Sequence, residues 1–382
     1  MPTLFLYLFW MSFMLCLGTY AIYPALIWFI GSCCPFKVNT KSFTPFVSVI
    51  ISAFNEARHI SEKIQNTLAV DYPKDQLEIL VGSDGSNDNT ASIMDEYTNG
   101  NIHFFDFPEN RGKTAVQNDL VKKAKGDVLV FTDAASFISS GSIQSITANF
   151  SDVRVGCVAG CMRFLKTDTN LTTQSQGLYW RYESKIRELE SRVGSLIGVD
   201  GPLYALKSEF YVPLKNHMIS DLLTPLLVLE KGGKVVFESN AQVDEEPTTK
   251  TAQEFSTRRR ITLRGLVGLW NHKYLLNPIR HPFLAFQIIF HKVVRWGIGI
   301  LWGINIISCA VLAAHPIFLG LIYLHCLFLA MALMGWATSQ KNGTCRILTI
   351  PYYFCLVNLA ATMGIIDFIR KKQAVSWKPV RE

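Results

Sequence analysis

Four acidic residues could carry chemistry because of their type and of where they lie along the chain. They are Glu56, Asp84, Asp133 and Asp221. A carboxylate within hydrogen-bond reach of a hydroxyl can act as a general base. A carboxylate near phosphate oxygens is a common ligand of Mg²⁺. Helix capping is the alternative role, since Asp and Asn are favoured at helix N-caps; it applies equally to Asn55, Asn87 and Asp88.

These residues need a scaffold, and the chain from 46 to 132 alternates between strand-like and helix-like segments. Strands are predicted over 46–53, 77–82, 102–105 and 128–132, and helices over 56–70, 89–97 and 113–124. Such alternation predicts βαβ units and an α/β fold with a mainly parallel sheet. Three of the four acids follow predicted strands. Ligands bind at the carboxyl ends of strands in such sheets, so the sequence predicts a site there.

The alternation loosens after about residue 165. Further helices are predicted over 174–193, 216–231 and 252–274, with a Gly-rich segment at 194–204 and a strand at 234–237. Another predicted strand carries Cys157 and Cys161. The helix 252–274 mixes arginines with Leu, Val and Trp, which is typical of a helix on a membrane surface.

A basic tripeptide, Arg111-Gly112-Lys113, opens one of the predicted helices. Backbone N–H groups at a helix N-terminus together with two cations favour an anion such as phosphate. A solvated basic loop is the alternative. The chain has neither a GxxxxGK[ST] loop nor a GxGxxG motif after a strand, which argues against a P-loop NTPase and a dinucleotide oxidoreductase.

The composition predicts a membrane protein. Hydrophobic residues make up 49 % of the 382 residues and charged residues only 18 %, which excludes a disordered chain. Membrane spans are predicted over 3–30, 293–313, 316–337 and 347–369, with a second interfacial stretch at 283–290. The implied division is 1–36 as the first span, 37–250 as the cytoplasmic domain, 251–291 as interfacial helices, 292–369 as further spans and 370–382 as a basic tail.

The net charge of +7 is concentrated beside the predicted spans. Basic segments there usually face anionic lipid on the cytoplasmic side, so we expect no nucleic-acid partner. Lys37 and Lys41 place the end of the first span in the cytoplasm of a multi-pass inner-membrane protein. Four spans would put the tail outside, whereas Arg370–Lys372 argue for inside; either the last segment is re-entrant or the tail disobeys the charge rule.

Cysteines and histidines suggest no metal centre. The nine cysteines form no CxxC pair, so reduced thiols and no zinc site are expected. His291, His315 and His325 lie in or near spans without an evident carboxylate partner, so we expect them to pack between helices.

Four motifs in order resemble the GT-A nucleotide-sugar domain of glycosyltransferase family 2. They are SVIISAFNE, GSDGSNDNT, RGKTAVQN and VLVFTDAAS, and the resemblance continues to about residue 270. A GT-A domain between spans is similar to the membrane-integrated cellulose, hyaluronan, chitin and poly-N-acetylglucosamine synthases. This resemblance implies a cytoplasmic GT-A domain that uses a UDP-sugar with Mg²⁺ or Mn²⁺.

The resemblance also implies roles for individual residues. Ala53, Phe54, Glu56 and Asp84 match positions that hold uracil and ribose, and Lys113 matches a basic position near the nucleotide. Asp133 matches the first Asp of the metal-binding DxD motif, and Asp221 matches the general base. Gly201 and Tyr204 fall in the region of the acceptor-site loop.

Two departures from the family pattern concern the diphosphate. Ala135 stands where the second DxD Asp is found, which removes a possible metal ligand. The QxxRW motif is replaced by the segment 257–261, in which Arg260 keeps a cation but Gln and Trp are missing. These changes bear on processive polymerisation more than on sugar transfer itself.

The resulting expectation is an inverting glycosyltransferase that moves glucose or N-acetylglucosamine from a UDP-sugar to a growing polysaccharide. Two alternatives stay open: transfer of one sugar to a membrane lipid, and a nucleotide-sugar-binding regulator whose chemistry has lapsed. Membrane lipids are expected partners. Because few spans are predicted, self-association or a second subunit is expected if a polymer is to be moved across the membrane.

Overall fold

A computed structural model describes residues 2–98, 100–164, 171–248, 250–339 and 346–372. These residues form two compact units that alternate along the chain. The sheet unit contains the described residues of 30–165 and 187–246, and the helical unit contains those of 1–29, 166–186 and 247–372. The linear division at 36, 250, 291 and 369 stays a prediction, and the tail beyond 372 lies outside the described residues.

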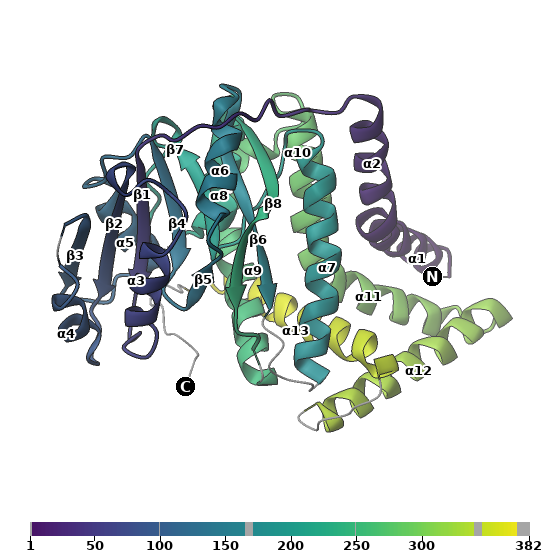
Figure 1. The fold of residues 1–382 in the computed structure, drawn as a ribbon. Coiled ribbons are helices and arrows are strands. Elements are labelled where there is room, and N and C mark those ends of the chain that lie inside the picture. The colour runs from purple at the N-terminus through teal and green to yellow at the C-terminus, as the bar shows by residue number, and fades with distance from the viewer. Residues whose placement is uncertain (1, 99, 165–170, 249, 340–345, 373–382) are drawn as a thin grey trace. The chain divides into compact units, whose positions relative to one another are not determined.

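The sheet unit is built on one mixed sheet whose strand order is β3-β2-β1-β4-β7-β6-β8-β5 (Figure 1). Its described strands are β1 (Val47–Ala53), β2 (Leu77–Asp84), β3 (Ile102–Phe107), β4 (Val128–Asp133), β5 (Ser136–Ile138), β6 (Val155–Phe164), β7 (Leu203–Lys207) and β8 (Lys234–Glu245). Strands β3, β2, β1 and β4 are mutually parallel, and β6 is parallel to β8. Strand β7 runs antiparallel to β4 and β6, and β5 runs antiparallel to β8. The predicted α/β fold with a mainly parallel sheet is confirmed.

Helices cover both faces of this sheet because its central strands are apolar on both sides. The helices are α3 (Ile60–Leu68), α4 (Thr90–Asp95), α5 (Lys113–Val121), α6 (Ser142–Ala148) and α8 (Ser220–Glu230). One core joins Val49 and Val130 of the sheet to Ile64 of α3, together with residues of α4 and α6. The opposite core joins Ile50 to Val116 of α5, together with residues of α8. Adjacent strand residues therefore point to opposite helical layers.

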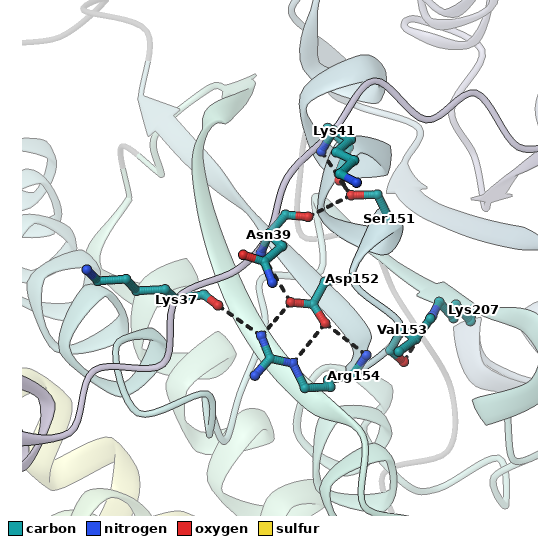
Figure 2. A network of polar contacts seen from close by, with 9 residues as sticks. Lys37, Asn39, Lys41, Ser151, Asp152, Val153, Arg154 and Lys207 are labelled. Carbon is teal, nitrogen blue, oxygen red and sulfur yellow. Dashed lines mark hydrogen bonds and ion pairs between the residues drawn. The ribbon is translucent and has the colours of Figure 1, made fainter.

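The chain after the first span is fastened to the sheet unit by a polar network (Figure 2). The backbone N–H of Asn39 donates to Asp152 Oδ2 at 3.1 Å, and Arg154 Nη2 donates to the carbonyl oxygen of Lys37 at 3.0 Å. The guanidinium of Arg154 also lies 4.5 Å from the centroid of the Phe36 ring. This segment, which we call the strap (residues 34–46), is thus held by hydrogen bonds to the Asp152–Arg154 ion pair and by packing of Arg154 on Phe36.

The helical unit contains the long apolar helices. Its described elements are α1 (Pro2–Leu17), α2 (Tyr23–Cys33, whose last residues belong to the sheet unit), α7 (Leu171–Ser191, which ends in the sheet unit), α9 (Thr251–Asn271), α10 (Pro282–Ile288), α11 (Val294–Val311), α12 (Pro316–Thr338) and α13 (Thr349–Ile369). Turns of π-helix at Gly18–Ile22 and Ile289–Val293 continue α1 into α2 and α10 into α11. Among the described residues, four helices are long and apolar enough to cross a membrane: Pro2–Cys33, Pro282–Val311, Pro316–Thr338 and Thr349–Ile369.

Several element boundaries differ from those predicted. The helix predicted from residue 56 begins at Ile60, because residues 57–59 form a turn. The helix predicted from 216 begins at Ser220. The predicted stretch 283–290 is continuous with the following span through the π-turn, so the two predicted segments are one helix. Strand β8 extends eight residues beyond its predicted end at 237, to Glu245.

Candidate active site

Two loops at the carboxyl ends of β1 and β2 are joined by hydrogen bonds. The Asn87 N–H donates to Asn55 Oδ1 at 2.8 Å, and the Ala57 N–H donates to Asp88 Oδ2 at 3.0 Å. Asn55 has a φ of 54°, a left-handed conformation that Asn tolerates better than most residues. The other carboxylate oxygen of Asp88 accepts the N–H of Thr90, the first residue of α4, at 3.0 Å. Asp88 therefore links the two loops, but Asn89 and not Asp88 is the N-cap residue of α4, so the capping alternative is not confirmed for Asp88.

The three residues predicted at the end of β1 lie beside these loops and are largely buried. Ala53 is the last residue of β1, and Phe54 follows it. Glu56 Oε2 lies 3.0 Å from Nδ1 of His59, and the Glu56 N–H donates to Thr90 Oγ1 at 2.9 Å. The loops after β1 and β2 are thus held together by hydrogen bonds at the carboxyl ends of these strands. Contact of these residues with a nucleotide stays a prediction.

Asp84 orders the loop that leads to α5. Its carboxylate accepts the backbone N–H of Arg111 at 2.9 Å and of Gly112 at 2.8 Å. The carboxylate is fully buried, and burial raises its pKa in spite of these two hydrogen bonds. Gly85 has a φ of 68°, and a Cβ there would lie 2.7 Å from the backbone nitrogen of Asn110, so only glycine fits. Asp84 thus holds the backbone just before α5, whose first residue comes next in the chain.

That side chain is Lys113, whose Nζ lies 2.5 Å from Oδ1 of Asp133. The Lys113 side chain is 15 % exposed and that of Asp133 is 27 % exposed, so the pair lies at the surface of the unit with a face open to solvent. Arg111 pairs with Asp119 at 2.9 Å and packs over Phe107. Both cations thus have carboxylate partners, and the predicted anion site at the start of α5 stays a prediction.

Asp221 reaches the same place from α8. A Cβ on Gly201 would lie 2.9 Å from Asp221 Oδ2 and 3.0 Å from Lys113 Nζ, so both charged groups approach the Gly201 backbone closely. Ile219, not Asp221, occupies the N-cap of α8, and Ser220 Oγ donates to Asp221 Oδ1 at 3.2 Å. The capping alternative is therefore not supported for Asp221. We call the group of Lys113, Asp133, Gly201 and Asp221 the carboxyl-end cluster.

Tyr204 lies beneath this cluster rather than on its surface. Its ring is 1 % exposed and stacks on Phe131 of β4 with centroids 4.8 Å apart. Burial, and then the nearby Asp221 carboxylate, raise the pKa of the Tyr204 hydroxyl well above its ordinary value. Its predicted role in acceptor binding is untested and stays a prediction, as does that of Gly201. Arg260 lies on α9 in the helical unit, and its predicted role toward the donor also stays a prediction.

One residue beside the cluster was missed by sequence reasoning. Lys63 of α3 is completely buried and points to the end of β4. Its position in the sequence held a signal, because Ile60, Ile64 and Thr67 occupy the same buried stripe of an amphipathic helix. A lysine in that stripe must find polar partners in the interior.

The residues of the cluster fit a divalent cation that is shared with a phosphate ligand. Asp133 is a partly exposed carboxylate at the site, but Ala135 adds no ligand. Across the described residues, no group of three His, Cys, Asp or Glu side chains is placed to hold a metal ion. Mg²⁺ in enzymes is often held by one or two carboxylates, with substrate phosphates and water completing the shell. Asp133 can serve as such a single protein ligand.

The sequence matches the family model described as glycosyl transferase family 2 over residues 48–205. Two curated relatives are named poly-beta-1,6-N-acetyl-D-glucosamine synthase. That of Staphylococcus epidermidis is 25 % identical over 196 residues, 48 % of this chain and 47 % of the relative. That of Staphylococcus aureus (strain COL) is 25 % identical over 222 residues, which are 54 % of this chain and 52 % of the relative. The chain thus spans about half the length of the curated relatives it matches.

A solved structure shares the fold over nearly the whole chain. It is a mannosyltransferase of Pyrobaculum calidifontis in complex with GDP-Man and Mn²⁺, with a TM-score of 0.72 and 19 % identity. The match covers 96 % of this chain and 100 % of that protein. The sheet unit accordingly has the GT-A fold.

Proposed function

We propose, on the premise that residues 48–205 form a domain of glycosyltransferase family 2, that this protein is a membrane-bound inverting glycosyltransferase. Its donor is a UDP-sugar of the glucose or N-acetylglucosamine type, and its acceptor is a growing polysaccharide. Names of relatives that match half of the chain support the polysaccharide and the N-acetylglucosamine donor.

The observation that carries this proposal is the carboxyl-end cluster. It pairs the Asp133 carboxylate of β4 with the Lys113 ammonium of α5, and it brings that ammonium and the Asp221 carboxylate of α8 beside Gly201. Sugar transfer from a nucleoside diphosphate needs a stabilised leaving group and a base for the acceptor. The cluster offers both, with Lys113 between Asp133 and Asp221.

The reaction that follows is a single displacement. The acceptor hydroxyl oxygen attacks C1 of the donor sugar, the bond from C1 to the diphosphate oxygen breaks, and the nucleoside diphosphate leaves with the electron pair. Asp221 accepts the hydroxyl proton, and Lys113 donates to the departing diphosphate. Attack from the side opposite the leaving group inverts the configuration at C1.

A divalent cation, Mg²⁺ or Mn²⁺, would be held by Asp133 together with phosphate oxygens of the donor. When bound, it neutralises part of the negative charge of the diphosphate. Lys113 Nζ lies 2.5 Å from one oxygen of Asp133, so this ion pair would have to open, or share its carboxylate, for Asp133 to hold the cation. This opening requires a pair that is not fully buried, which is what the exposure of Asp133 provides.

The membrane context follows from the four apolar helices. We propose a multi-pass protein of the inner membrane whose sheet unit faces the cytoplasm, because Lys37 and Lys41 follow the first span. Self-association or a second subunit would supply further helices if a polymer crosses the membrane.

A single-sugar transfer to a membrane lipid is the second candidate. It is favoured by the segment 257–261, which keeps Arg260 but lacks the Gln and Trp expected of polymerising synthases. Product size separates the two candidates. A regulator without turnover is less well supported, because Lys113 lies beside Gly201 with Asp221 and is also paired with Asp133.

The experiment that tests the proposal is nucleoside-diphosphate release by detergent-purified protein. A panel of UDP-sugars and GDP-mannose is supplied with Mn²⁺ or Mg²⁺ and an extract of membrane acceptors. Asp221→Asn removes the base, and Asp75→Asn changes an exposed carboxylate outside the cluster. Release with one UDP-sugar that is lost in Asp221→Asn and kept in Asp75→Asn supports the proposal, and NMR of the product linkage then tests inversion.

Three outcomes would contradict parts of the proposal. Release only from GDP-mannose would overturn the donor. A product with retained anomeric configuration would overturn the single displacement. Full turnover in Asp221→Asn would show that Asp221 is not the general base.

A further inference from the structure

A buried lysine supports the turn that carries Asp133. Lys63 lies on α3 with no exposed surface, and it is among the largest completely buried side chains in the described residues. Burying an ammonium costs free energy unless hydrogen bonds compensate, so a buried lysine usually has a specific task. An apolar residue at position 63, like Ile60 and Ile64 on the same face of α3, would be buried without this cost.

The partners of Lys63 lie on both sides of Asp133. Its Nζ donates to Thr132 Oγ1 at 2.8 Å and to the backbone oxygen of Ser136 at 2.5 Å. Thr132 is the residue before Asp133 at the end of β4, and Ser136 is the first residue of β5. The ammonium therefore ties the two ends of the turn at residues 133–135 to one point on α3.

A neighbouring side chain strengthens this attachment. Asn66, one turn further along α3, donates from Nδ2 to the Ile138 oxygen at 2.9 Å and accepts the Ile138 N–H at Oδ1 at 2.8 Å. Strand β5 lies at the edge of the sheet and has only three residues, so it has few ladder hydrogen bonds of its own. Lys63 and Asn66 together hold β5, and hence the exit of the turn, against α3.

The geometry separates the supporting group from the reacting group. Side chains alternate along a strand, so Thr132 points to the α3 layer and Asp133 to the opposite layer, where Lys113 meets it. Lys63 thus acts on Asp133 through the backbone. Burial lowers the pKa of Lys63 to about 7, and the Asp133 charge partly opposes that shift.

We propose that Lys63 is a positioning residue, which fixes the Asp133 carboxylate for donor binding by hydrogen bonding to Thr132 and Ser136 on either side of it. The inference rests on the proposed function of the carboxyl-end cluster. Groups that orient a metal- or phosphate-binding side chain typically change affinity by about 10- to 100-fold when removed.

The decisive variants change Thr132, because Lys63→Met leaves backbone acceptors unpaired and can fail to fold. Thr132→Val keeps the shape and removes the acceptor, whereas Thr132→Ser keeps the acceptor. Lys74→Met is the matched control, since Lys74 Nζ also donates to a backbone oxygen near the end of α3, that of Val70 at 2.9 Å, away from the cluster.

Two readouts are measured on the full-length protein in detergent. Titration calorimetry gives the Kd of UDP with Mn²⁺, and steady-state kinetics give KM for donor and acceptor separately. We expect Thr132→Val to weaken UDP binding and raise donor KM about 10-fold or more with acceptor KM unchanged. Thr132→Ser and Lys74→Met should stay within about twofold of wild type.

The outcomes separate this inference from the proposed function. If Asp133→Asn weakens UDP binding while Thr132→Val leaves Kd and donor KM unchanged, the positioning role is overturned and the proposed function stands. A lower melting temperature in Thr132→Val without a change in donor KM overturns it as well, because it shows a purely structural role. If Asp133→Asn itself changes neither quantity, the proposed function fails first.

Discussion

The charged groups of the sheet unit and of the helical unit are arranged in opposite ways. In the carboxyl-end cluster, Asp133 has one close ion-pair partner and a side chain that is 27 % exposed. In the helical unit, Glu183 of α7 is 3 % exposed and faces three basic side chains at once. These are Arg295 at 2.8 Å, His291 at 3.3 Å and Lys292 at 3.7 Å.

A second carboxylate of the helical unit follows the same pattern. Glu254 of α9 is buried and accepts hydrogen bonds from Arg258 at 2.8 Å, Tyr353 at 2.6 Å and Gln176 at 2.7 Å. A buried carboxylate with several donors has its desolvation offset but cannot exchange its partners without a large loss. A half-open pair costs little to separate, so it can pass its charge to a ligand.

This difference distinguishes charges that hold helices together from the charges to which we assign a role in sugar transfer. It also corrects the expectation that His291 has no carboxylate partner and only packs between helices.

Replacing Glu183 by Gln should destabilise the protein most, by about 3–5 kcal/mol, because Arg295 and Lys292 lose their buried counter-charge. Thermal unfolding in detergent measures this loss, and turnover per folded molecule should stay near wild type. Glu96→Gln, an exposed carboxylate of the sheet unit, is the control. Lost turnover with unchanged stability would place Glu183 in the chemistry and break the comparison.

Lys113→Met should lower turnover strongly and stability little, the reverse of Glu183→Gln. Removing a group that stabilises developing charge typically lowers rate about 10²–10³-fold, so we expect kcat/KM for the donor to fall by that amount. Stability should change little, because Asp133 can be hydrated when its partner is gone. Lys122→Met, which removes an exposed lysine on the same helical segment, is the matched control. A folding defect as large as that of Glu183→Gln would show that the two pairs are equivalent.

Gly201→Ala should lower turnover about 10- to 100-fold, since its Cβ would lie 2.9 Å from Asp221 Oδ2 and 3.0 Å from Lys113 Nζ. The methyl group must push one of these charged groups aside. Gly141→Ala serves as the control, because a Cβ there meets nothing within 4 Å. Equal kcat and KM values in both variants would mean that the close approach at Gly201 has no catalytic use.

Asp152→Asn should have the smallest effect, about 1 kcal/mol of stability at pH 7, because its partner Arg154 is half exposed. Hydrogen bonds from Arg154 hold the pKa of the Asp152 carboxyl well below its usual value of 3.8. A carboxyl with a lowered pKa stabilises the folded state above its unfolded pKa and loses that contribution as the pH falls below about 4. Unfolding measured from pH 7 to pH 3 should therefore show a smaller acid loss in the variant than in wild type. An identical loss of stability at low pH in both proteins would show that Asp152 does not contribute to the pH dependence.

The first half of the sheet was predictable because its signals are local. Strands β1 to β4 are short buried runs bounded by turns, and their predicted limits agree with the structure within two residues. The second half was predicted only in part. The strands at Cys157–Cys161 and from 234 are present as β6 and β8, but β7 was missed, because it begins at the end of the predicted Gly-rich segment and pairs with β4, far away in the sequence. The short edge strand β5 has too few residues for a periodic pattern.

The site was predictable to a different degree for each kind of residue. Asp133 and Lys113 follow from strand ends and helix starts, and Asp221 was among the acids singled out first, to which the resemblance added the role of general base. Lys63 was missed because a lysine on an amphipathic helix ordinarily faces water, and only the tertiary structure shows its two acceptors. The counter-ions of Glu183 were likewise hidden, since they come from a distant segment of the chain.

The antiparallel pairing of β4 with β7 has a consequence for synthesis on the ribosome. The edge of β4 next to Asp133 stays uncovered until residue 207 has been made, and the helical unit is completed later still. At roughly 5–20 residues per second, that delay is on the order of ten seconds. An uncovered central strand can pair with another chain. We therefore expect the half-made protein to be prone to aggregation unless its first helix inserts early into the membrane or a chaperone covers β4.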